Sequence, residues 1–268
     1  MSAISFVLRA ATTAAAAFVS SLVLPAVAAD AAEIKVLSSV ALTSALDELA
    51  PVFEHSTGNK LIIGYGIAAQ LRQRLIGGET ADVIILTQPL MDDLQKQGKL
   101  LSGSLMNVGG TAVAVAVRAG TPKPDISSVD AFKRTLLSAK SIVYADPAKG
   151  GASGVYFARV LERLGIAEQL KAKTILVPGA QAAEVVARGE ADFGIGQASE
   201  IVPVTGAQVL GPLPGEIASV TVFTAGIGAG TKTPEADKEL IRFLTGPAAA
   251  PILKVKGFEP KGEIYRLR

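Results

Sequence analysis

The feature that most constrains this chain is the alternation of short apolar runs with segments of helical period. Apolar runs of four to six residues, bounded by Gly, Pro, Asn or Asp, indicate buried strands. In the helix expected over 42–55, Leu46, Leu49 and Phe53 fall on one stripe, and Gly58 follows as a stop signal. Alternation of this kind is typical of parallel βα units, so we expect an α/β fold.

Two runs break the alternation, because the strand expected in each has no helix of its own. They lie at 111–117 and 220–227, beside stretches rich in Pro and Gly. We expect these strands to cross between two α/β lobes, which makes the first lobe discontinuous in sequence. The predicted first lobe comprises 30–111 plus 222–268, and the predicted second lobe comprises 112–221.

The remaining expected elements follow the same two periodicities. The other strands are predicted at 34–37, 61–65, 83–86, 142–144, 174–177 and 193–196. The helices are predicted at 42–55, 68–76, 89–97, 129–138, 153–164, 180–188, 234–244 and 248–254. Together they predict two parallel or mixed sheets, flanked by helices and joined by the two crossing strands.

The first 29 residues differ in composition from the rest of the chain. Arg9 is their only charge, an Ala-, Val- and Leu-rich run follows, and small residues precede Asp30. This pattern predicts a secretory signal over 1–29, cut near Ala29. The alternative is a transmembrane helix. It is disfavoured because Thr, Ser and Pro residues interrupt the apolar run and because no charge cluster follows it. Since the chain contains no Cys, a lipid-anchored lipoprotein is excluded.

Composition also argues against several classes of function. The formal net charge of +2 gives no electrostatic footprint for nucleic acid. Without Cys there is no disulfide, thiolate nucleophile or Cys-rich metal site. His55, the single histidine, stands near a helix end, where a capping or solvated role is favoured over catalysis. No G-x-S-x-G elbow, P-loop or G-x-G-x-x-G motif occurs, so the chain is not expected to be an enzyme.

Three Asp residues at expected strand edges are candidate metal ligands. They are Asp82, Asp146 and Asp192. An Asp in such a position more often accepts hydrogen bonds from nearby backbone N–H groups. We therefore predict three turn caps, with neither a metal site nor a cofactor.

Four turns that lead into helices are the better candidates for binding. Ser38 and Ser39 precede the first helix, "GYGIAAQL" opens the second, "GGASGVY" opens one in the other lobe, and "VPGAQAAEV" opens a fourth. The first N–H groups of a helix lack intrahelical partners, and the helix dipole favours anions there. Ligands of open parallel sheets bind at the carboxyl ends of the strands, where these turns lie. Each turn alone is better explained by capping, but the four together indicate a binding cleft.

The order of motifs resembles the periplasmic molybdate-binding family of ABC importers. The resemblance rests on "IKVLSSVALTSALDELAPVFE", "GETADVIILT", "YADPAKGGASGVYFARVLERLG", "GEADFGIGQASE" and "FLTGPAAAPILKVKGFEP", which cover nearly all of the chain beyond the signal. It implies the type II periplasmic binding protein fold, in which two lobes close over a ligand. It further implies a monomer that delivers its ligand to a permease in the inner membrane.

The resemblance also implies a ligand set, which this chain matches only in part. The family holds an oxyanion with two Ser hydroxyls, backbone N–H groups from both lobes and a Tyr hydroxyl. The Ser positions fall at Ala41 and Ala68 here, and the Tyr position falls at Gln197. The second-lobe donors fall near Ser153 and Gly154 and near the stretch from Gly179 to Gln181. Losing three hydroxyls, each worth about 1.5–3 kcal/mol toward a charged ligand, argues against molybdate.

Three further side chains could adapt the cleft to a larger ligand. Arg72 lies one turn after Ala68, so its guanidinium could reach over that turn and grip a carboxylate. The alternative for Arg72 is a solvated side chain beside Arg74. Tyr65 and Tyr156 could line the pocket, or pack in the core or at a hinge.

The sequence therefore predicts a periplasmic solute-binding protein that captures a small anion between its lobes. An organic carboxylate is favoured, and molybdate or tungstate is the alternative. A secreted hydrolase on the same scaffold is a distant alternative, because no nucleophile–base pair is evident. A sensing role without transport makes no different prediction from the sequence.

Overall fold

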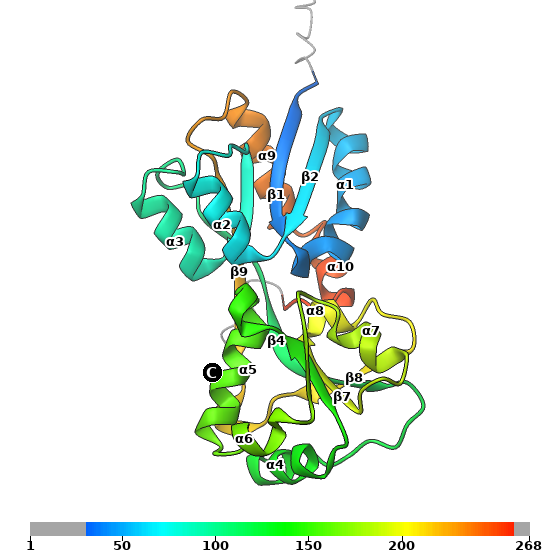
Figure 1. Ribbon diagram of the computed structural model, residues 1–268. Helices are drawn as coiled ribbons and strands as arrows, with labels where there is room; N and C mark the ends of the chain where they lie inside the picture. The colour runs from blue at the N-terminus through cyan, green and yellow to red at the C-terminus, as the bar shows by residue number, and fades with distance from the viewer. Residues whose placement is uncertain (1–30, 260–268) are drawn as a thin grey trace, which may run out of the picture. The chain divides into compact units, whose positions relative to one another are not determined.

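Nine strands form one mixed sheet in the computed structural model, which describes residues 31–259 (Figure 1). Their spatial order is β2-β1-β3-β9-β4-β7-β5-β6, and β8 pairs with β4 off this path. The strands are β1 Glu33–Ser39, β2 Lys60–Gly66, β3 Val83–Thr87, β4 Met106–Arg118, β5 Ile142–Ala145, β6 Thr174–Val177, β7 Phe193–Gln197, β8 Ala207–Pro212 and β9 Val220–Ile227. The expected signal over 1–29 lies outside the described residues.

The helices follow the strands closely in sequence. The α-helices are α1 Thr43–Thr57, α2 Ala68–Ile76, α3 Gln88–Lys96, α4 Val129–Ser138, α5 Ala152–Arg163, α6 Ala167–Lys171, α7 Ala182–Ala187, α8 Ala198–Ile201, α9 Pro234–Leu244 and α10 Ala250–Val255. Short 3-10 helices are η1 Val40–Leu42, η2 Pro147–Lys149 and η3 Gly215–Ile217. Between residues 31 and 259, no helix is long and apolar enough to cross a membrane.

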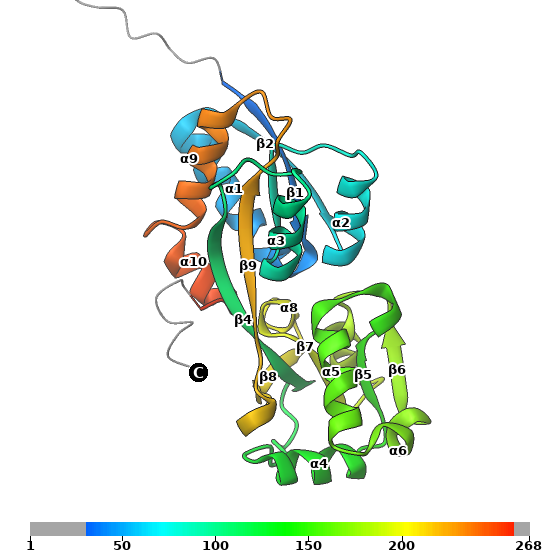
Figure 2. The ribbon, with the colours of Figure 1, turned by 90° about the vertical axis from the view of Figure 1, so that its left-hand side faces the viewer.

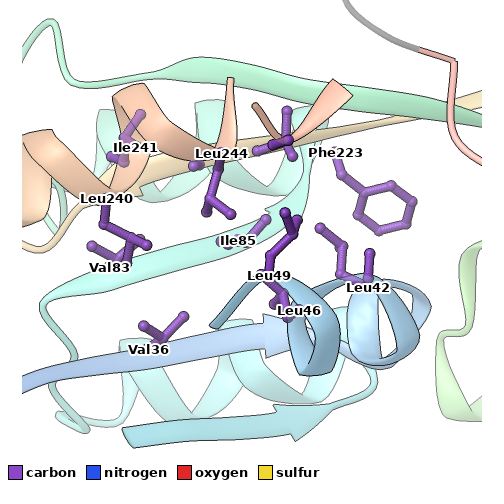
Figure 3. Close-up of a cluster of buried hydrophobic side chains, with 14 of the residues drawn as sticks. Val36, Leu42, Leu46, Leu49, Val83, Ile85, Phe223, Leu240, Ile241 and Leu244 are labelled. Carbon is purple, nitrogen blue, oxygen red and sulfur yellow. The ribbon is translucent and has the colours of Figure 1, made fainter. Parts of the chain in front are cut away.

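Strands β1, β2, β3 and β9 and the first part of β4 make up the first half of the sheet. Strands β1, β2 and β3 are parallel, and β9 runs antiparallel to β3. Because side chains alternate along a strand, Val36 and Ile85 face α1, α9 and α10, whereas Leu37 and Ile84 face α2 and α3. Figure 3 shows part of the hydrophobic cluster around Val36 and Ile85, to which Leu240 of α9 belongs. Helices thus cover both faces of this half.

The second half of the sheet repeats this arrangement with β5, β6, β7, β8 and the end of β4. Strand β5 is parallel to β6 and β7, and β4 is antiparallel to β7 and β8. One face packs against α4, α5 and α6 through Phe132, Phe157 and Leu170. The other packs against α7 and α8 through Val186 and Ile201. This half is therefore also covered on both faces.

Two long antiparallel strands connect the halves. Strand β4 pairs with β9 from Met106 to Ala112 and with β7 from Val113 to Ala116 (Figure 2). The prediction of two crossing strands is confirmed, but β4 starts earlier than expected and makes the two expected sheets continuous. The lobe boundaries, 30–111 plus 222–268 and 112–221, stay a prediction, since the chain from Ala31 onward forms a single compact unit.

All three Asp residues at strand edges accept backbone hydrogen bonds, but only Asp146 caps a turn as predicted, because the N–H groups bonded to Asp82 and Asp192 lie 47 and 52 residues away in sequence. Asp82 accepts from the Lys35 N–H at 2.8 Å, and Asp192 accepts from the Lys140 N–H at 2.6 Å. Asp146 accepts from the Ala148 N–H at 2.9 Å and caps η2. No group of three or more acidic or His side chains that could hold a metal ion occurs within 31–259. His55 lies exposed in the last turn of α1.

Some elements escaped the periodicity analysis. Strand β8 lies in the Pro- and Gly-rich stretch that reads as a loop, and Pro212 at its end suits a strand that pairs on one side only. Helices α6 and α8 contain five and four residues, which is too few for a helical period to show.

Gly154 in the first turn of α5 is required by packing against β5. A Cβ at this position would lie 2.0 Å from the Ala145 carbonyl oxygen, closer than any real contact. We expect Gly154→Ala to lower the free energy of unfolding by about 1–3 kcal/mol, because α5 must shift away from β5. Gly230→Ala is the matched control, since a Cβ there meets no atom within 4 Å. Equal urea midpoints for the two variants would contradict this packing.

Candidate functional site

A small cavity lies at the carboxyl ends of the central strands and draws its walls from both halves of the sheet. We call it the central cavity, and its volume is about 30 Å³. That volume holds about two water molecules. Its walls are formed by Ser39, Ala41, Ala68, Thr87, Ala145, Gly151, Ala152, Ser153, Gly179, Gln197, Glu200 and Phe223.

Two helices begin at this cavity from opposite halves of the sheet. Helix α2 starts at Ala68 and α5 at Ala152, and neither has a side chain that caps its first turn. A Cβ at Gly150 would lie 2.6 Å from the Ala69 Cβ, so the two helix starts approach each other closely. Figure 1 shows these ends facing each other. The unpaired N–H groups and the positive dipole ends of both helices therefore converge on one point.

Hydroxyl groups stand beside these helix starts. Ser153 is 96% buried on α5, and its hydroxyl has no hydrogen-bond partner in residues 31–259. The Ser39 hydroxyl accepts a 3.4 Å hydrogen bond from the Ala41 N–H, which leaves its proton free to be donated. Thr87 at the end of β3 contributes a third hydroxyl. Neutral donors of this kind suit an anion.

Gln197 presents an amide at the end of β7. It is buried, and its Nε2 donates to the Thr221 hydroxyl at 2.8 Å. Its Oε1 faces the Glu200 N–H in the capping box at the start of α8, but it makes no hydrogen bond of standard geometry within residues 31–259. Because this orientation places the amide oxygen toward a backbone donor, Gln197 offers an acceptor at the cavity.

Glu200 is the one carboxylate in the wall of the central cavity. Its Oε2 accepts a 3.0 Å hydrogen bond from the Gln197 N–H. Burial raises the pKa of Glu200 to about 7, the nearby Glu184 raises it further, and the Gln197 N–H opposes the rise. At neutral pH this group is therefore present in both protonation states.

A second opening adjoins the central cavity through Glu200. We call it the outer pocket, and its volume is about 630 Å³. Its charged side chains are Asp47, Glu48, Glu184, Glu200 and Lys256, of which Lys256 pairs with Glu48 at 2.8 Å. Negative charge thus predominates in the outer pocket, whereas neutral donors predominate in the central cavity.

The structure brings together several of the residues expected to bind the ligand. Ser39, Ala41, Ala68, Ser153 and Gln197 all lie in the wall of the central cavity, although they come from both halves of the sheet. Their role as ligand contacts remains a prediction. The other expected residues lie outside this wall.

Arg72 is the most consequential correction. Its Nε donates to the Asp93 Oδ2 at 2.6 Å, and the pair joins α2 to α3. The guanidinium beside Asp93 holds the pKa of that carboxyl below its usual value. Arg72 lies on α2 one turn after Ala68, as predicted. Its side chain points to α3 and not over the Ala68 turn, because the Asp93 carboxylate on α3 pairs with its charge.

The two tyrosines also have partners away from the central cavity. The Tyr65 hydroxyl donates to the Asp47 Oδ1 at 2.8 Å, and burial together with Asp47 raises the pKa of Tyr65. The Tyr156 hydroxyl donates to the Ile217 carbonyl at 3.0 Å, within the core of the second half of the sheet. Core packing is the better description of Tyr156.

The remaining residues expected to contact the ligand do not line the central cavity. Ser38 is fully buried beside the cavity, and its hydroxyl donates to the Ser39 carbonyl at 3.2 Å. Gly154 directly follows the wall residue Ser153 on α5, and it packs against the Ala145 carbonyl of β5. Of the expected donor stretch from Gly179 to Gln181, Gly179 lies in the wall, whereas Gln181 is exposed ahead of α7 and does not reach it.

Sequence analysis missed Thr87, Phe223 and Glu200. Thr87 could have been found from the rule that ligands bind where parallel strands end, since it follows the apolar run of β3. Glu200 stands three residues after Gln197, but α8 is too short for its period to be recognised. No signal in the sequence distinguishes Phe223 from other apolar strand residues.

Comparison with known proteins supports both the fold and the resemblance. The model of a family described as bacterial extracellular solute-binding proteins matches residues 34–259. Aconitate isomerase from Pseudomonas sp. is 36% identical over 231 residues, which cover 84% of this chain and 87% of that protein. Molybdate-binding protein ModA from Azotobacter vinelandii is 29% identical over 243 residues, which cover 87% of this chain and 92% of that protein.

A solved structure gives the same picture at the level of the fold. The periplasmic molybdate-binding protein of Azotobacter vinelandii superposes with a TM-score of 0.67 at 22% identity, covering 84% of this chain and 98% of that one. The expected α/β periplasmic binding protein fold and the resemblance to molybdate-binding proteins are thereby confirmed.

The raised pKa of Glu200 should be visible in the pH dependence of stability. The folded chain holds this proton more tightly than the unfolded chain, so the free energy of unfolding falls as pH rises from about 4.5 to about 7. Glu200→Gln removes this loss, and the variant should gain roughly 1–3 kcal/mol over the wild type between pH 4.5 and 8. Urea denaturation across this range measures it, with Glu216→Gln, at an exposed carboxylate, as control. A gain that does not change with pH would contradict the assignment.

Proposed function

Because this chain belongs to the family of bacterial extracellular solute-binding proteins, we propose that it captures a small organic polycarboxylate in the central cavity. In this proposal the chain is a periplasmic monomer, exported by the signal over 1–29, that hands its ligand to the permease of an ABC importer. Capture requires no metal, cofactor or nucleic acid.

The observation that carries the proposal is the convergence of the starts of α2 and α5 on one cavity whose other donors are neutral. Uncapped helix starts attract an anion, and the hydroxyl of Ser153 adds a donor without a competing partner. Ala41 and Ala68 stand where the molybdate-binding pattern has Ser, which removes donors that a tetrahedral oxyanion needs. Small side chains at these positions also leave space for a larger ligand.

The relative named aconitate isomerase supports a tricarboxylate of the aconitate type as the ligand. Such a ligand exceeds the central cavity of about 30 Å³, so binding requires the two halves of the sheet to separate first. Strands β4 and β9, which pair across both halves, are the natural hinge. Negative charge in the outer pocket disfavours carboxylates there and directs them to the helix starts.

The name of that relative also favours a second candidate function, conversion of the captured tricarboxylate between isomers. Molybdate or tungstate remains the alternative ligand, supported by the similarity to molybdate-binding proteins.

A thermal-shift and calorimetry panel on the chain from Asp30 tests the proposal. We expect cis-aconitate, trans-aconitate and the saturated analogue propane-1,2,3-tricarboxylate to raise the melting temperature, with stabilisation of about 2.7 kcal/mol at a hundredfold excess over Kd. Molybdate, tungstate and sulfate should have little effect. Stabilisation by micromolar molybdate, together with no response to any carboxylate, would refute the proposal.

Substitutions at Ser153 on α5 and at Arg72 on α2 distinguish which of these two side chains contacts the ligand. Ser153→Ala should weaken binding of propane-1,2,3-tricarboxylate about 10- to 100-fold, because it removes a hydrogen bond to a charged group. Arg72→Ala should leave the affinity within about twofold, because its guanidinium is bound to Asp93. Calorimetry measures both. Loss of binding in the Arg72 variant alone would instead mean that this side chain swings into the cleft on ligand binding.

A further inference from the structure

Glu200 is an unexpected residue for a cavity that favours anions. A carboxylate in the wall repels an anionic ligand, and every other side chain in that wall lacks a charge. A structural capping role explains only its Oε2, which accepts from the Gln197 N–H. Its Oε1 has no hydrogen-bond partner in residues 31–259. One oxygen of Glu200 is thus fixed by the backbone, and the other remains available.

The surroundings of Glu200 leave its proton mobile at neutral pH. The charged side chains that share its opening are Glu184 on α7, Asp47 and Glu48 on α1, and Lys256 at the end of α10. Lys256 is engaged by Glu48 at 2.8 Å, and Glu184 is the carboxylate that acts most on Glu200. Four further elements pack against α8, namely β4, β7, β8 and η1, and their one charged residue is Arg118, the last residue of β4. A group with a pKa of about 7 serves equally as proton acceptor and proton donor.

We propose that Glu200 moves a proton within the bound ligand, so that this solute-binding scaffold isomerises the unsaturated tricarboxylate that it captures. This inference rests on the proposed polycarboxylate ligand. It assigns Glu200 as the proton-transfer residue of the second candidate function, the conversion between isomers.

The step is a proton shift along a three-carbon unit. The Glu200 carboxylate takes a proton from the methylene carbon of aconitate, which breaks a C–H bond and forms an O–H bond. The electron pair spreads over the three carbons and an attached carboxylate. Glu200 then returns the proton to the carbon at the other end, the double bond moves by one position, and its new geometry can be cis or trans. Electrons stay in the ligand, so no oxidant, reductant or metal is needed.

The helix starts provide what this step needs besides the base. Negative charge that moves onto a ligand carboxylate is stabilised by preorganised N–H groups, and α2 and α5 direct theirs at the same cavity. The hydroxyl of Ser153 adds a donor beside them. Exclusion of water when the two halves of the sheet close over the ligand strengthens each of these interactions. Binding and proton transfer therefore use different groups of one site.

Proton NMR of cis-aconitate incubated with the wild-type chain tests the inference, with binding of propane-1,2,3-tricarboxylate measured alongside. That analogue has no double bond to move, so it reports binding alone. We expect the wild type to bind the analogue and to form trans-aconitate, with kcat/KM rising with pH to a plateau above about pH 7. Glu200→Gln should bind the analogue within about threefold of the wild type and lose at least about 100-fold in kcat/KM. Glu200→Asp should retain an intermediate rate, and Glu184→Gln should still convert the ligand.

The outcomes separate the two proposals. A wild type that binds the analogue and forms no trans-aconitate overturns the isomerisation and leaves the capture function standing. Unchanged turnover in Glu200→Gln overturns the role of this residue. A wild type that binds neither the analogue nor aconitate overturns both the capture function and the inference built on it.

Discussion

The close approach of α2 and α5 at their N-terminal ends is the constraint on which the site depends. Gly150 and Ala69 come so near that only small residues fit between the helix starts. Each helix follows a strand of a different half of the sheet, so the contact exists only when both halves have folded and met. Because neither helix start is capped by a side chain, their N–H groups are left for a ligand. Gly154, packed against the Ala145 carbonyl, fixes the position of α5 in this arrangement.

The charge around the cleft is divided between two compartments. Neutral donors surround the central cavity, while carboxylates predominate in the outer pocket. Glu200 stands at the boundary, where burial and Glu184 weaken its acidity. In a site that only captures anions, capping of α8 accounts for one oxygen of this carboxylate and leaves the other without a role. In the proposed reaction, Glu200 supplies both the acid and the base.

Periodicity predicted most of the architecture, because buried strands and amphipathic helices leave a strong pattern. Helices α2, α4 and α9 and strand β9 have the predicted bounds. Strand β8 was missed, because its Pro and Gly residues suit an edge strand as well as a loop. The same limit applies to α8, whose four residues include Glu200, the carboxylate in the wall of the central cavity.

Side-chain direction was harder to predict than backbone position. Ala41, Ala68 and Gln197 were placed at the cavity, since strand ends and helix starts follow from the fold. Arg72 was not, because its direction depends on Asp93 of α3, a partner 21 residues away in sequence. Sequence spacing on one helix gives no information about such a partner.

The convergence of α2 and α5 implies that a carboxylate of the ligand binds where these two helices begin. A crystal structure of the chain from Asp30 with propane-1,2,3-tricarboxylate would locate that carboxylate. We expect one ligand carboxylate within hydrogen-bond distance of the backbone N–H groups at Ala68 and Ser153, with Glu200 beside the ligand's carbon chain. A ligand bound in the outer pocket, or held by Arg72 away from these helix starts, would contradict it.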